Sequence, residues 1–273
     1  MTIATSHFDV IREIVYRGAG IVLEPGKEYL VESRMHPILR AHSLTDLGEL
    51  VTKLQSGGSA ALQSEVIDAM TTNETSFFRD HHPFETLRTE VLPGTLERNQ
   101  SNRSLRVWCA ACSSGQEPYS IAITLQEHFG AKINGWQVEI LGTDISDEML
   151  EKSSSGAYSE LEINRGLPAP LMVKHFQRVG LQWQIKPEVR RLVRFRKMNL
   201  VEPWPSMPKF DIVFLRNVLI YFDPDTKRQI LGRLKSVLAP GATLFLGGAE
   251  TVINFADDFE IVRLGRTVVY RVR

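Results

Sequence analysis

The chain has 273 residues, of which 43% are hydrophobic and 23% charged, and its formal net charge is zero. This composition is ordinary for a globular protein that is long enough for one large domain and one small domain. The balanced charge argues against a general nucleic-acid binder, and two cysteines argue against a disulfide framework. No apolar run is long enough to span a bilayer, so the sequence predicts a cytoplasmic protein without membrane insertion.

Residues 1–70 show the apolar spacing of amphipathic helices. Phe8, Ile11 and Val15, for example, would share one helical face. The sequence therefore predicts a small all-helical domain over residues 1–70. The polar segment 71–83 breaks this pattern and is expected to be a linker.

From residue 104 onward, short β-like runs alternate with helical patterns. The predicted strands are residues 105–110, 138–142, 193–198, 210–215 and 243–247, and a hairpin around Gly265 follows them. Such alternation predicts an α/β fold with a doubly wound, mostly parallel sheet over residues 84–273. Sheets of this kind bind ligands at the carboxyl ends of their strands, so the site is expected there.

The segment after the first predicted strand, residues 111–118, is built from small residues around Gly115. It lacks the three glycines of a dinucleotide-binding turn and therefore suits a cofactor without a pyrophosphate. Glu117 could place a carboxylate against the cationic amino group of a bound amino acid. Alternatively, Ser114 and Glu117 could form a capping box at the start of the next helix.

Polar residues also follow the next three predicted strands. Asp144 could accept hydrogen bonds from both ribose hydroxyls, although it could instead be a helix N-cap. Asn199 offers a donor and an acceptor to a purine edge, and Leu200 could pack on its face. Arg216 and Asn217 follow a buried strand, where polar groups are costly unless they are used. The four strand ends together predict a site for an adenosine-containing cofactor.

Several longer runs resemble the bacterial chemotaxis receptor methyltransferases, the CheR family of protein-glutamate O-methyltransferases. The matching runs are residues 71–79 (TTNETSFFR), 110–120 (AACSSGQEPYS), 142–144 (GTD), 165–168 (RGLP) and 214–222 (FLRNVLIYF). The resemblance implies a helical N-terminal domain joined to a Rossmann-like methyltransferase domain. It also implies the cofactor S-adenosylmethionine, the product S-adenosylhomocysteine, and glutamates on the cytoplasmic helices of chemoreceptors as substrates in sensory adaptation.

The resemblance also assigns roles to residues and brings the linker 71–83 into the site. The implied cofactor-binding set is Asn73, Thr75, Arg79, Glu117, Asp144, Asn199, Leu200, Arg216 and Asn217. Arg79 and Tyr221 match the catalytic positions nearest the transferred methyl group. The alternatives are a linker salt bridge from Arg79 to Asp80 or Glu74, and core packing of Tyr221 beside Phe222.

Residues 174–197 hold eight Lys and Arg side chains and one acidic residue, Glu188. This segment is expected to be an inserted basic β-subdomain, either as a solvated edge or as a docking surface for an acidic partner. In the CheR family a subdomain here can bind a C-terminal pentapeptide tether of some receptors. The loop 176–183 is shorter than in tether-binding members, so we expect that no tether is needed.

Three other interpretations remain open from the residues. Cys109 and Cys112 have the spacing of a redox or metal pair, but no further ligands complete a zinc site, so no metal is expected. Residues 217–221 (NVLIY) faintly resemble the N-P-P-Y motif of nucleic-acid methyltransferases but lack both prolines. A non-catalytic receptor adaptor that binds S-adenosylmethionine is the third possibility.

Overall fold

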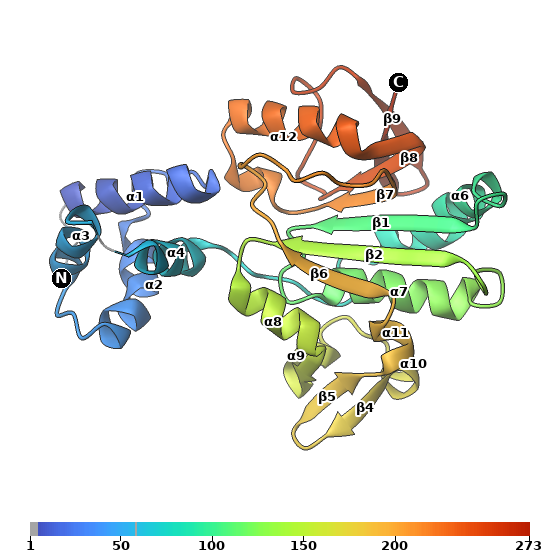
Figure 1. Cartoon of the computed structure of the whole chain (residues 1–273), viewed down its shortest axis with the longest axis horizontal. Coiled ribbons are helices and arrows are strands. Elements are labelled where there is room, and N and C mark those ends of the chain that lie inside the picture. The colour runs from blue at the N-terminus through green and yellow to red at the C-terminus, as the bar shows by residue number, and fades with distance from the viewer. Residues whose placement is uncertain (1–4, 58) are drawn as a thin grey trace. The chain divides into compact units, whose positions relative to one another are not determined.

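The computed structural model describes residues 5–57 and 59–273, and the chain divides into two compact units (Figure 1). We call them the helical unit and the sheet unit. The helical unit runs up to Thr72 and includes Tyr221–Lys227; the sheet unit comprises Asn73–Ile220 and Arg228–Arg273. None of the described helices is long and apolar enough to cross a membrane.

The helical unit confirms the helices expected in residues 1–70. Its helices are α1 (Thr5–Ala19), α2 (Glu28–Ala41), α3 (Leu47–Gln55) and α4 (Ala60–Met70). The apolar stripe of α1 is buried at Phe8, Ile11 and Val15, as its spacing predicts. The Asp46 and Ser59 side chains cap α3 and α4 by accepting hydrogen bonds from backbone N–H groups.

The segment Tyr221–Lys227 belongs to the helical unit through contacts with the end of α1 and the residues after it. The N–H of Val22 donates to the carbonyl of Tyr221 at 2.9 Å, and Ile21 forms a β-bridge with Phe222. The Tyr16 hydroxyl donates to Asp223 at 2.9 Å. This unit is therefore assembled from two separate stretches of sequence.

The described part of the sheet unit forms a seven-stranded sheet in the order β6-β2-β1-β7-β8-β10-β9. The strands are β1 (Ser104–Ala110), β2 (Gln137–Asp144), β6 (Val193–Lys197), β7 (Phe210–Leu215), β8 (Leu238–Leu246), β9 (Phe259–Leu264) and β10 (Thr267–Val272). The pairs from β6 to β8 are parallel, and β10 pairs antiparallel with β8 and β9. The predicted doubly wound α/β fold is thereby confirmed.

Helices connect the parallel strands in two directions along the sheet. Helix α7 (Gln116–Phe129) leads from β1 to β2, and α12 (Pro224–Val237) leads from β7 to β8 in the opposite direction (Figure 1). Because such crossovers are right-handed, these helices cover opposite faces of the sheet. The helical segments α5 (His82–Thr86), η1 (Leu87–Val91) and α6 (Leu92–Arg98) precede β1.

The described residues between β2 and β6 form a small antiparallel sheet in the order β3-β5-β4. Its strands are β3 (Ala157–Ser159), β4 (Phe176–Val179) and β5 (Gln182–Ile185), with helices α8 (Asp147–Ser155), α9 (Glu160–Asn164), α10 (Ala169–His175) and α11 (Pro187–Arg190) around them. It overlaps only part of the predicted segment 174–197. Strand β3 lies outside that segment. Strand β6 lies inside it but pairs with β2 of the large sheet, with the buried Val193 opposite Ile140.

Three aromatic side chains join the segment 71–83 to the core of the sheet unit. The fully buried ring of Phe77 meets the rings of Tyr158 and Phe176 edge to face, with ring centroids 5.0 and 5.5 Å away. Such pairs add to the stability gained from burying their area. The fully buried Phe77 therefore anchors the polar sequence around it to the core.

Candidate functional site

The parallel strands bring the predicted strand-end residues to one edge of the large sheet. Strands β6, β2, β1 and β7 are consecutive neighbours, so the segments after their carboxyl ends lie next to one another. The segment Ala111–Gly115 follows β1 and is the one predicted to bind the cofactor, so we call it the cofactor loop. Asp144 ends β2, and Arg216 follows β7 directly.

The cofactor loop is a tight turn with left-handed backbone conformations. The φ angles of Ala111, Ser113 and Gly115 are 56°, 50° and 92°. A Cβ atom on Gly115 would lie 2.8 Å from the Cβ of Ser153, so only glycine fits there. Among the described residues no side chain caps α7 at Gly115, so the alternative capping box of Ser114 with Glu117 does not form.

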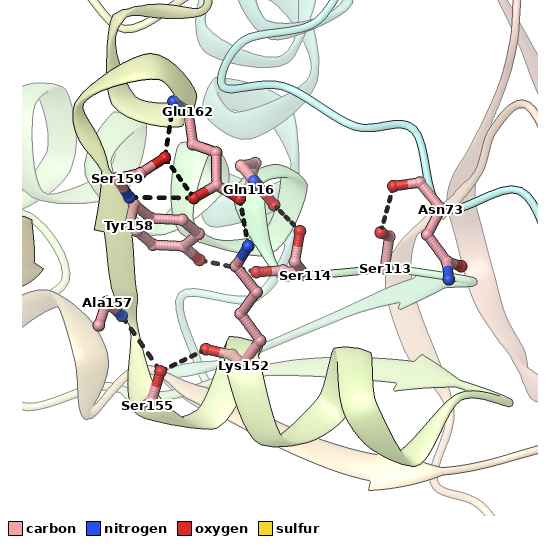
Figure 2. A network of polar contacts seen from close by, with 10 residues as sticks. All are labelled: Asn73, Ser113, Ser114, Gln116, Lys152, Ser155, Ala157, Tyr158, Ser159 and Glu162. Atoms are coloured by element: carbon pink, nitrogen blue, oxygen red, sulfur yellow. Dashed lines mark hydrogen bonds and ion pairs between the residues drawn. The ribbon is translucent and has the colours of Figure 1, made fainter. Parts of the chain in front are cut away.

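Hydrogen bonds hold this loop from three sides (Figure 2). The Tyr158 hydroxyl donates to the carbonyl of Ser114 at 2.8 Å, and the Ser114 hydroxyl donates to Oε1 of Gln116 at 2.9 Å. The Ser113 hydroxyl donates to the backbone carbonyl of Asn73 at 2.8 Å. The last contact brings the segment 71–83 against the cofactor loop.

Tyr158 is a supporting residue that the sequence did not reveal. It is the central residue of β3 and is fully buried, and burial raises the pKa of its hydroxyl well above the usual range. Next to it, Ser159 and Glu162 form a capping box for α9, and Glu162 also pairs with Lys152 (Figure 2). The small sheet therefore supports the cofactor loop through the Tyr158 hydroxyl.

The Asp144 carboxylate accepts hydrogen bonds from the backbone on both of its oxygens. Oδ2 accepts the N–H of Ser113 at 2.7 Å, and Oδ1 accepts the N–H of Ser146 at 3.0 Å. Burial raises the pKa of Asp144, while these N–H groups act to lower it. Ser146, not Asp144, is the N-cap of α8. A carboxylate has about four acceptor positions, so Asp144 keeps capacity for further donors.

Arg216 connects two acidic residues from distant parts of the chain. Its side chain is 2% exposed; Nη1 donates to Glu117 at 2.9 Å and Nη2 to Asp80 at 2.6 Å. Burial raises the pKa of Glu117, and the Arg216 charge opposes that shift. Among the described residues, the buried Nε of Arg216 has no hydrogen-bond partner.

Arg79 lies in a strained turn of the segment 71–83. Phe78, Asp80 and His81 around it have φ angles of 50°, 69° and 51°, a conformation that non-glycine residues adopt only when contacts enforce it. Arg216 Nη2 donates to the Arg79 carbonyl at 3.3 Å, which fixes this backbone.

The Arg79 side chain donates from Nη1 to the carbonyl of Glu74 at 2.9 Å. The two salt bridges considered as alternatives for Arg79, to Asp80 and to Glu74, do not form between these described side chains. The Asp80 carboxylate pairs with Arg216, and the Glu74 carboxylate pairs with Arg165. Arg79 as a whole is half-buried.

Three further residues predicted to bind the cofactor, Asn199, Leu200 and Thr75, have different surroundings. The Asn199 amide donates to Glu202 at 3.1 Å and accepts the N–H of Val201 at 3.2 Å, and Leu200 is buried. Thr75 is half-buried in the sheet unit.

Tyr221 is half-buried and belongs to the helical unit, at the end of the short helix η2 (Leu219–Tyr221). Its neighbour Phe222 is the buried one of the two. The assignment of Tyr221 to catalysis, like that of the cofactor-binding residues, stays a prediction.

The cysteine pair lies in the buried core of the sheet unit. Cys109 and Cys112 are both free and buried, and burial raises the pKa of each thiol well above its usual range. A buried neutral thiol is a poor nucleophile. No group of three or more metal-binding side chains occurs among the described residues.

Comparison with known proteins matches both units of the chain. A family model described as the all-alpha domain of CheR methyltransferases matches residues 6–71. A second, described as the SAM binding domain of CheR methyltransferases, matches residues 73–268.

Curated relatives match over nearly the whole length. Chemotaxis protein methyltransferase 1 of Pseudomonas aeruginosa is 41% identical over 278 residues, covering 100% of both chains. The chemotaxis protein methyltransferase of Vibrio anguillarum is 40% identical and covers 100% of this chain and 99% of its own. That of Salmonella typhimurium is 36% identical and covers 98% of this chain and 91% of its own.

Proposed function

The chain belongs to the CheR methyltransferase family, and from this premise we propose that it methylates glutamate side chains on the cytoplasmic helices of chemoreceptors. The cofactor is S-adenosylmethionine, bound by the sheet unit. The proposed products are a glutamyl methyl ester and S-adenosylhomocysteine. The names of the relatives, chemotaxis protein methyltransferases, support a chemoreceptor substrate.

The residues at the sheet edge suit an adenosine that carries a charged amino acid. Asp144 is an anionic acceptor with capacity for ribose hydroxyls. Glu117 offers a largely buried carboxylate to a cationic amino group, and Arg216 Nη1 holds that carboxylate in place. The side chains of Ser153, Phe195 and Tyr158 pack against Gly115 and thereby fix the turn of the cofactor loop.

The chemistry needs little from the protein beyond placement. S-adenosylmethionine supplies a methyl group on a sulfonium centre. A glutamate side chain has an unperturbed pKa of about 4.3, so it is already an anionic nucleophile near neutral pH. We propose that Arg79 orients the substrate carboxylate through its guanidinium. Because that carboxylate is already anionic, the transfer requires no general base.

The observation that carries this proposal is the buried guanidinium of Arg216. It contacts Glu117 on one side and the Asp80 carboxylate and Arg79 carbonyl on the other. One side chain thereby ties a proposed cofactor-binding group to the backbone of the proposed substrate-orienting group. Such rigid placement of reacting groups can account for a large part of a rate enhancement.

The test is transfer of a labelled methyl group to receptor cytoplasmic fragments, followed by base treatment. Release of volatile methanol identifies a carboxyl methyl ester and is the expected result. Base-stable label in added nucleic acid would instead support a nucleic-acid methyltransferase. Cofactor binding without any transfer would support a receptor adaptor that lacks catalysis.

We also propose that recognition does not require a C-terminal receptor tether. Strands β4 and β5 are joined through Gly180 and Leu181 alone, which supports a short hairpin with little surface for a peptide. Calorimetry with a receptor C-terminal pentapeptide should detect no binding. Micromolar affinity for that peptide would contradict the proposal.

A further inference from the structure

Glu250 follows β8 at the same edge of the sheet and accepts hydrogen bonds from four backbone N–H groups. Oε1 accepts from Val218 at 2.9 Å and from Leu219 at 2.7 Å. Oε2 accepts from Asn217 at 2.7 Å and from Gly247 at 2.7 Å. The carboxylate thus joins the segment after β7 to the segment after β8.

The backbone at Asn217 explains why these donors point to one carboxylate. Asn217 has a φ of 59°, a left-handed conformation that asparagine tolerates better than most residues. The helix η2 follows at Leu219, so the N–H groups of residues 217, 218 and 219 converge. Successive N–H groups of this kind form an anion-binding concavity. Here a carboxylate of the chain itself fills that concavity.

Gly247 provides independent evidence that the positions of Glu250 and Asn217 are tightly set. A Cβ atom on Gly247 would lie 2.7 Å from Oε2 of Glu250 and 2.8 Å from Nδ2 of Asn217. The Asn217 side chain therefore packs directly over Gly247. At the next residue, Gly248, no described atom lies within 4 Å of such a Cβ.

We propose that Glu250 is a positioning residue that holds Asn217 in its cofactor-binding conformation. The inference rests on the proposed role of Asn217 in binding S-adenosylmethionine. Asn217 adopts an unfavourable backbone conformation, and the contacts that enforce it come from the Glu250 carboxylate. Without that carboxylate the N–H groups of residues 217–219 and 247 lose their shared acceptor, and the Asn217 side chain loses its fixed direction.

The variant Glu250→Gln tests this inference. Its amide keeps one acceptor oxygen but turns the other into a donor that faces two N–H groups. We expect the Kd for S-adenosylmethionine to rise by about tenfold or more, as for the loss of a charge-assisted hydrogen bond. The KM for the cofactor should rise with it, while kcat at saturating cofactor falls less. The Kd and the kinetic constants are measured on a variant that circular dichroism shows to be folded.

A matched pair of glycine variants keeps the test sharp if Glu250→Gln does not fold. Gly247→Ala should weaken cofactor binding because its methyl group displaces Glu250 and Asn217. Gly248→Ala should bind like the wild type. Normal cofactor affinity in folded Glu250→Gln, or equal affinities of the two alanine variants, would overturn the inference. Cofactor affinity does not depend on the methyl acceptor, so a failure of the proposed glutamate methylation would be seen separately.

Discussion

The edge of the large sheet at the carboxyl ends of its parallel strands, which we call the binding edge, has two halves that use carboxylates in different ways. In the half formed by β1 and β2, Asp144 accepts two backbone N–H groups and keeps capacity for a ligand. In the half formed by β7 and β8, Glu250 accepts four such groups. Both carboxylates stand beside a left-handed residue, Ser113 or Asn217.

Both carboxylates lie at the same edge of the sheet, so position alone does not separate Asp144, which is proposed to bind the cofactor, from Glu250, which holds a loop. The number of backbone donors that the carboxylate accepts is the more informative property. We expect the Asp144 half to contribute mainly affinity for the cofactor. In the half formed by β7 and β8, we expect Asn217 to contribute to cofactor affinity as well, whereas Arg79, whose carbonyl is held by Arg216, should contribute mainly the rate of transfer.

The largest effect is expected for Arg79→Ala. Loss of the guanidinium that orients the substrate should lower the rate of methyl transfer by at least about a hundredfold. Cofactor affinity should change much less, and calorimetry can measure it beside the methanol-release assay. Arg88→Ala, which removes an exposed ion pair with Glu85, is the control and should retain activity. Near-normal transfer by Arg79→Ala would remove this residue from its proposed role.

Asp144→Asn should have the opposite effect, weakening cofactor affinity more than it lowers the rate of transfer. The amide loses the charge and one acceptor, so the Kd for S-adenosylmethionine should rise by about ten- to a hundredfold. Transfer at saturating cofactor should stay close to normal. A comparison of kcat and KM for the cofactor measures the split. If kcat fell while KM stayed constant, the two halves would not differ as described.

Tyr158→Phe tests the hydrogen bond by which the small sheet stabilises the cofactor loop. The change leaves the buried carbonyl of Ser114 without its hydroxyl donor and should lower the free energy of unfolding by about 1–2 kcal/mol. Urea denaturation measures the loss. Tyr29 is 64% exposed, so Tyr29→Phe is the matched control and should leave the stability unchanged. Equal stabilities of the two variants would show that the Tyr158 hydroxyl does not support the loop.

The smallest effect is expected from the pH dependence of stability at Glu162. Burial acts to raise its pKa, but hydrogen bonds from Lys152 and Ser159 outweigh burial and hold the pKa below its usual range. The resulting stabilisation is present above the usual pKa and is lost as the pH falls through the folded value. Glu162→Gln should therefore lose less stability than the wild type on acidification, as urea titrations at several pH values can show.

Asp144 and Glu117 should act with the opposite sign. Burial raises the pKa of both, so their contributions are present below the usual pKa and decline as the pH rises through the folded values. The binding edge and the small sheet thus respond to acid in opposite directions. An acid response of Glu162→Gln identical to that of the wild type would contradict this contrast.

The sequence predicted the strands of the large sheet because apolar runs and the intervening helical patterns have different periods. It also predicted Asp144 and Arg216, since polar residues directly after buried strands stand out. Glu250 follows β8 in the same way, and searching that fifth strand end would have found it.

Other features depend on contacts that local sequence does not contain. Strand β3 has three residues, too few to show alternation. The partners Asp80 and Arg216 are 136 positions apart, and nothing near either residue indicates the other. The Asn199 amide, expected to be available for a purine, is engaged with Val201 and Glu202 in its own loop.

The segment Tyr221–Lys227 has a consequence for protein engineering. The chain passes between the units at residues 72–73, 220–221 and 227–228, so three peptide connections join them. A fragment that stops at Thr72 would lack the partners of Ile21, Val22 and Tyr16. A stable isolated helical unit would therefore require residues 221–227 to be grafted back after a designed linker.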